Sequence, residues 1–183
     1  HMDYLARESA PFSQEFWGEL DSAVIAAAKK QLVGRRFLHL FGPLGAGANS
    51  VTVDSVAKSE KLEDGMGYIT GRRVVELPQL FEDFTLLWRD LESSEKNGFP
   101  YDFSAAAAAA QRNARKEDEL IFWGNAKLGM EGLMNASGAC KIAKGDWKQG
   151  ENAFAEVAKG VMTFSEKGVL GSYSLVVSPD VYV

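Results

Sequence analysis

The sequence has 183 residues and a mass of 20.0 kDa, and its 46% hydrophobic and 25% charged residues are typical of a folded globular chain and argue against disorder. Lysine and arginine number 20 against 25 aspartate and glutamate residues, so the net charge of −5 argues against sequence-independent nucleic-acid binding. At this length we expect one compact domain that buries roughly 70% of the surface exposed by the unfolded chain.

The first predicted helix covers residues 14–33. Ser13 is a suitable N-cap, Glu15 complements the helix dipole in the first turn, and Gly34 is a typical stop signal. The apolar stripe of this helix recurs mainly at i, i+4 spacing and comprises Phe16, Leu20, Val24, Ala27, Ala28 and Leu32.

A two-stranded arm is predicted next. The Gly-rich stretch 42–49 lacks the lysine of a phosphate-binding loop and is interpreted as a plain loop. Residues 51–53 are β-prone, and two long strands are predicted at residues 68–77 and 80–88. Because such an arm has little core of its own, it needs a partner surface to stay ordered.

The second predicted helix, residues 104–123, is the clearest element. Ser104 is the expected N-cap, the alanine run 105–110 has the highest helix propensity, and Gly124 ends the helix. A third helix is predicted at about residues 149–165 and a buried strand at 173–177. The chain is therefore expected to be α+β.

No group of residues specifies an enzyme or a metal site. The consecutive carboxylates 117–119 point about 100° apart on a helix, and we interpret them as a solvated face or a subunit contact. His39 is interpreted as a structural polar group, with a base or a pH-sensitive contact as the alternative. The tryptophans are interpreted as core or interface anchors, but a flat ligand such as a flavin could instead stack on Trp88. Cys140 has no evident base to make it a nucleophile.

The numbers of cysteine and histidine residues also limit the cellular location and the kinds of site that the chain can have. One cysteine excludes an intramolecular disulfide and fits a reducing compartment, so a cytoplasmic location is expected. His1 and Met2 are interpreted as a cloning remnant, which leaves a single native histidine and argues against sites that need a histidine pair. No apolar run approaches the roughly 20 residues of a membrane span, and no signal peptide is evident.

Several sequence blocks, in order, resemble the encapsulin family of nanocompartment shell proteins, also labelled linocin or maritimacin-type bacteriocins. These blocks are YLARESAP at 4–11, QLVGRRF at 31–37, FTLLW at 84–88, EDELIF at 117–122 and GSYSLVV at 171–177. The resemblance implies the HK97 phage-capsid-like fold. It divides the chain into an N-terminal arm and P-domain helix (3–50), an E-loop arm (51–90), a P-domain spine helix (91–124) and a partial A-domain (125–183). The family also continues well past the position of Val183, so the chain is expected to be about two thirds of a longer one.

The resemblance further implies a non-enzymatic subunit. Many copies would assemble into an icosahedral shell that encloses a ferritin-like protein or a peroxidase as cargo. Cargo would be held through a C-terminal targeting peptide at a pocket that includes Leu32, Arg35 and His39, although family members often have an acidic residue at the position of His39. Contacts between subunits through the E-loop would involve Arg72, Arg73 and Trp88. The alternatives are a bacteriocin or protease-like activity, as in the older labels, and a small-molecule (flavin-type) binding module.

Overall fold

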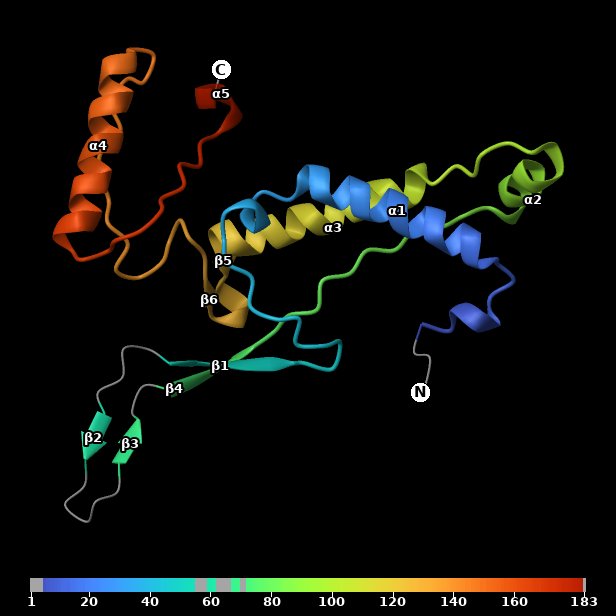
Figure 1. Ribbon diagram of the computed structural model, residues 1–183, viewed down its shortest axis with the longest axis horizontal. Helices are drawn as coiled ribbons and strands as arrows, with labels where there is room; N and C mark the ends of the chain where they lie inside the picture. Colours follow the sequence, from blue (N-terminus) through green and yellow to red (C-terminus); the bar gives the residue numbers. More distant parts are fainter. Residues whose placement is uncertain (1–4, 55–58, 62–66, 70–71, 183) are drawn as a thin grey trace.

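A computed structural model describes residues 5–54, 59–61, 67–69 and 72–182, and its centre is a pair of long helices. Helix α1 spans Gln14–Gln31 and α3 spans Ser104–Trp123, and the two lie side by side (Figure 1). The short helix α2 (Trp88–Asn97) lies at one end of the pair, and α4 (Gly150–Glu166) lies beyond the other end with α5 (Pro179–Tyr182).

The core lies where α1 meets the alanine run of α3. Ser13 caps α1, since its hydroxyl oxygen accepts a hydrogen bond from the amide of Phe16 at 3.1 Å. Small residues on α3 let the helices approach closely, so that the buried apolar side chains are Phe16, Leu20, Ala27, Ala106, Ala109 and Ala114. Aromatic rings surround Phe16 and extend this cluster; they belong to Phe12, Trp17, Tyr101 and Phe103.

In the described residues the strands form three separate antiparallel pairs. Strand β1 (Ser50–Asp54) pairs with β4 (Arg72–Glu76), with Ser50 opposite Glu76. Strand β2 (Ser59–Lys61) pairs with β3 (Gly67–Ile69), and β5 (Gly124–Asn125) with β6 (Met130–Glu131) at the end of α3. Figure 1 shows β1–β4 and β2–β3 beyond the helix pair, where they form an arm. The arm pairs residues 50–54 with 72–76, and the predicted strand at 80–88 does not contribute to it. Three short 3-10 helices complete the elements: η1 (Arg7–Ser9), η2 (Gly34–Arg36) and η3 (Ala126–Leu128).

Three expectations for local structure are wrong. Residues 80–87 are not a strand, because this extended segment runs along α3 without a paired strand, and α2 begins at Trp88. Residues 173–177 are extended but form neither a strand nor a buried segment, because no other strand lies against them in the described chain. Ser104 is the first residue of α3 rather than its N-cap, and its amide donates to the Asp102 carboxylate at 2.9 Å.

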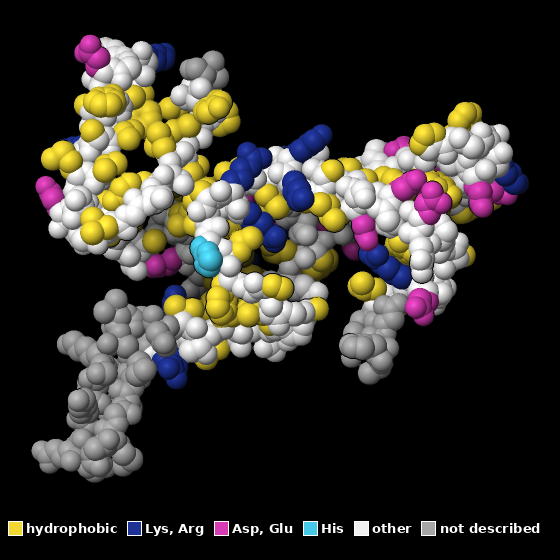
Figure 2. All heavy atoms as spheres, viewed as in Figure 1, with side chains coloured by type: hydrophobic (Ala, Val, Ile, Leu, Met, Phe, Trp, Pro, Cys, Tyr) yellow, Lys and Arg dark blue, Asp and Glu magenta, His cyan; other side chains and the backbone are white. Residues whose placement is uncertain are grey.

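The chain exposes far more surface than a compact monomer of its mass. Its accessible area is 15176 Å², whereas a compact 20.0 kDa protein exposes about 8,700 Å². Against the roughly 29,000 Å² of the unfolded chain, folding buries only about half, so the expected 70% is wrong. Figure 2 shows hydrophobic side chains gathered over α4 and the C-terminal segment beside it. Among the described residues, no helix is long and apolar enough to cross a membrane.

Candidate functional site

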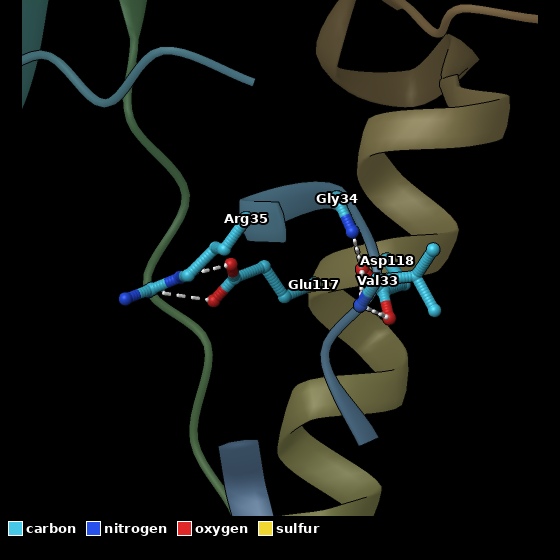
Figure 3. Close-up of polar contacts among 5 residues, drawn as sticks. All are labelled: Val33, Gly34, Arg35, Glu117 and Asp118. Carbon is cyan, nitrogen blue, oxygen red and sulfur yellow. Dashed lines mark hydrogen bonds and ion pairs between the residues drawn. The ribbon is translucent and has the colours of Figure 1, made fainter. Parts of the chain in front are cut away.

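The best-defined polar site joins the end of α1 to the middle of α3. Here the Asp118 carboxylate accepts hydrogen bonds from two consecutive backbone amides, at 2.9 Å from Val33 and 2.9 Å from Gly34 (Figure 3). Asp118 is only 9% exposed, so its charge is stabilised by these amides and not by solvent. The carboxylate thereby caps η2 and fixes the turn that leads from α1 towards the arm.

Gly34 allows this close approach. A Cβ atom at position 34 would lie 2.7 Å from Cδ1 of Ile121 and 3.4 Å from Oδ1 of Asp118. Any side chain there would therefore press against α3, which is why glycine fits at the turn.

A second carboxylate of α3 holds the side chain that follows. Glu117 accepts from Nε of Arg35 at 2.6 Å and from a terminal guanidinium nitrogen of Arg35 at 2.9 Å (Figure 3). The hydrogen bonds that Arg35 donates to Glu117 raise the pKa of Arg35 above its usual value, with Asp118 adding a smaller favourable charge. The pair is partly exposed, so it orients Arg35 more than it stabilises the fold.

This arrangement corrects the interpretation of residues 117–119 as a solvated face or subunit contact for Glu117 and Asp118, whereas Glu119 is exposed. Asp118 is buried and Glu117 binds Arg35 within the same chain. The helical spacing contains the missed signal, because Asp118 follows the buried Ala114 by four residues and precedes Ile121 by three. A carboxylate in an apolar stripe requires partners, and the amides of the turn supply them.

The predicted cargo-pocket residues lie on the same turn. Leu32 is half-buried at the C-cap of α1, Arg35 is held by Glu117, and His39 is exposed three residues after η2. These three residues lie close together because they are near neighbours in the sequence. Their role in binding cargo stays a prediction.

The predicted subunit-contact residues are divided between two places. Arg72 and Arg73 lie in β4, opposite Asp54 and Val53 of β1. Trp88 lies in the first turn of α2 and is 69% exposed, with the Arg89 guanidinium carbon 6.0 Å from its ring centroid. An exposed indole ring is available for stacking, but these contacts do not distinguish a flavin from a protein partner.

Within the described part of the chain, no group of three or more His, Cys, Asp or Glu residues could hold a metal ion. Cys140 is exposed. The groups gathered around Asp118 are carboxylates, a guanidinium and backbone amides.

The architecture is that of a capsid-like fold. The structure is similar to a crystal structure of a virus-like particle from Pyrococcus furiosus, with a TM-score of 0.56 and 21% sequence identity over 81% of this chain and 56% of that one. The likeness shows the fold, and it confirms the expected α+β, HK97-like capsid class.

Residues 2–183 match the Linocin_M18 family, described as the encapsulating protein for peroxidase, and the chain belongs to this family. It is 38% identical over 188 residues to the type 1 encapsulin shell protein EncA of Myxococcus xanthus. It is also 38% identical over 177 residues to a diheme-cytochrome-encapsulin shell fusion protein of Kuenenia stuttgartiensis. These relatives are named as shell proteins and not as enzymes.

The matches cover 98% and 93% of this chain but only 66% and 49% of those two relatives. The chain thus spans less than two thirds of their length.

Proposed function

We propose that this chain forms a shell subunit of an encapsulin nanocompartment, which assembles with many copies of itself and encloses a cargo protein without catalysing a reaction. The observation that carries the proposal is the accessible area of 15176 Å², about 6,500 Å² more than a compact protein of this mass exposes. A standard protein interface buries about 800 Å² on each partner, so this excess is enough for several interfaces.

The character of the exposed surface supports assembly. Large apolar side chains are exposed in many of the segments whose side chains the structure describes, including Phe41, Phe81, Phe154 and Leu170. Apolar surface of this extent is typical of protein–protein contacts and is rare on monomers. The arm also presents strand edges of β1 and β4 that have no further partner among the described strands, and such edges readily pair with another chain.

Cargo is proposed to dock at the turn after α1. The Asp118 contacts fix this turn, and the Glu117 pair orients Arg35, which leaves Leu32, Arg35 and the exposed His39 on a preorganised surface. The proposed ligand is a C-terminal targeting peptide of a ferritin-like protein or a peroxidase. Arg72, Arg73 and Trp88 are proposed to contact neighbouring subunits. The proposed setting is the cytoplasm, without bound nucleic acid or membrane.

Assembly is tested by mass photometry and negative-stain imaging of the purified protein at physiological salt. The expected result is closed particles of many copies. Their ultraviolet absorbance spectrum should be that of protein without nucleic acid. A strictly monomeric species would overturn the proposal, and particles filled with nucleic acid would overturn its account of partners.

Cargo docking is tested by co-expression with a fluorescent protein that carries the C-terminal peptide of a candidate cargo. His39→Ala should lower the ratio of cargo to shell, whereas Arg36→Ala, an exposed neighbour in η2, should leave it unchanged. Equal cargo content in the two variants, with intact particles, would remove His39 from the pocket.

A further inference from the structure

Residues 77–87, here called the strap, connect the arm to α2. The strap continues directly from β4, and the amide of Leu77 still donates to the carbonyl of Asn49 at 2.8 Å. After that bond, residues 78–86 make no backbone–backbone hydrogen bond within the described parts of the chain. Side chains must therefore hold the strap in place.

Apolar packing holds the strap at its two ends. Leu86 packs against the core cluster of Phe16, Leu20 and Ala106. Near the arm, Pro78 and Leu80 are half-buried and line an open cleft of about 520 Å³ that also borders Trp123 of α3. Between these ends, Phe81 and Phe84 are exposed, so the middle of the strap has little apolar burial.

A single carboxylate bridges this middle part of the strap to α3. Glu82 accepts a hydrogen bond from Nε of Arg112 at 2.8 Å and pairs with Nζ of Lys116 at 2.5 Å. Arg112 and Lys116 are four residues apart and so lie on one face of α3, and Nζ of Lys116 also contacts the carbonyl oxygen of Phe81 at 3.3 Å. The Glu82 side chain is 17% exposed, whereas its two partners on α3 are about half exposed, so water screens both pairs in part.

We propose that Glu82 is a positioning residue that fixes the direction in which the arm, residues 50–76, leaves the helix pair. The strap is the only stretch of chain between β4 and α2, so a change in its path against α3 is passed on to β4 and its partner β1. This inference deepens the proposed function and rests on it to the extent that the arm meets a neighbouring subunit.

The charges around Glu82 set the expected pH response. Arg112 and Lys116 face it from α3, and Asp83 follows it on the strap. Hydrogen bonds from Lys116 and then Arg112 lower the pKa of Glu82 below its usual value. The ion pairs of Glu82 with Arg112 and Lys116, here called the bridge, are therefore complete above the ordinary carboxyl pKa range. They are lost as the pH falls through the lowered pKa of Glu82.

The test measures the position of the arm by pulsed electron spin resonance. Spin labels are attached at Thr52→Cys in β1 and Gln111→Cys in α3, two exposed positions, on a Cys140→Ser background and diluted with unlabelled chain. With Glu82 present the distance distribution should be narrow. With Glu82→Gln it should broaden roughly twofold, because the uncharged amide weakens both pairs.

Controls separate positioning from general destabilisation. Glu92→Gln breaks an exposed pair with Lys96 in α2, whose atoms lie 2.6 Å apart, and should leave the distribution narrow. Glu82→Asp keeps the charge and should restore most of the narrow distribution. Acid should broaden the distribution of the parent protein but have little further effect on Glu82→Gln. An unchanged distribution in Glu82→Gln, or the same broadening in Glu92→Gln, would overturn the inference.

Imaging of the same samples separates this inference from the proposed function. If Glu82 positions the arm in a shell, Glu82→Gln particles should be more varied in diameter than Glu92→Gln particles. A broadened distance with no particles from the parent protein would support the bridge and refute the shell. Uniform particles together with an unchanged distance would refute the bridge alone.

Discussion

Replacing Asp118 by alanine tests how the turn after α1 is held. The substitution removes the acceptor for the amides of Val33 and Gly34, and Gly34 is buried. Each buried donor left without a partner costs about 1–3 kcal/mol, or about 2–6 kcal/mol for two. Because Val33 is only half-buried, we expect a loss of about 2–4 kcal/mol in the local stability of the turn. Relaxation of the turn towards water would place the value at the lower end of this range.

Hydrogen exchange followed by mass spectrometry measures this loss locally, whether or not the protein is assembled. For the peptide that contains Val33 and Gly34, 2 kcal/mol corresponds to exchange about 30-fold faster. The control is Glu117→Ala, which breaks the partly exposed pair with Arg35 and should cost only about 0.2–1 kcal/mol. If exchange in Asp118→Ala were no faster than in Glu117→Ala, the Asp118 contacts would not be what holds the turn.

Three further predictions concern packing, pH and ligand binding. Gly132→Ala should destabilise the β5–β6 turn by about 1–3 kcal/mol or more, because a Cβ atom there would collide with the backbone of Phe122, whereas Gly47→Ala has open space and should be nearly neutral in denaturant unfolding. Hydrogen bonds from Arg7 lower the pKa of Asp21. The stability that this pair contributes is therefore present above the ordinary carboxyl pKa and is lost as the pH falls through the lowered pKa of Asp21. Asp21→Asn should flatten this part of the stability–pH curve by less than about 1 kcal/mol, since both side chains of the pair are over a third exposed. Purified protein should absorb only in the aromatic bands, and a visible band that disappears in Trp88→Ala would establish the flavin alternative.

The helices were predictable because local signals define them. The Ser13 cap of α1 and Gly124 at the end of α3 lie where the sequence places them, and α4 begins and ends within one residue of its predicted limits. Helical hydrogen bonds join near neighbours in the chain, so short-range patterns are enough to locate these elements.

The strands were less predictable because they depend on partners distant in sequence or on another chain. Residues 83–86 of the strap alternate polar and apolar side chains, but alternation cannot show whether a second strand is present. Residues 173–177 have the composition of a buried strand and yet stay exposed in this chain.

At the site, the burial of Asp118 was missed because three consecutive carboxylates suggest a solvated face. The position of Asp118 on the helix instead indicates a buried residue. The partners of Asp118 are backbone amides 84 and 85 residues away, which no side-chain motif records. The burial of Asp118 could have been expected from its helical spacing, whereas the identity of its partners required the fold.

The alanine seam between α1 and α3 has a mechanical consequence. Over 20 residues α3 extends about 30 Å, and its small side chains leave no soft layer between the two helices. The helix pair is therefore rigid, with the core cluster near one end and the contacts of Asp118 and Glu82 further along. A bulky residue at Ala109 would tilt the helix pair by a small angle. In a closed shell every copy would have the same tilt, and together these tilts would change the curvature of the shell.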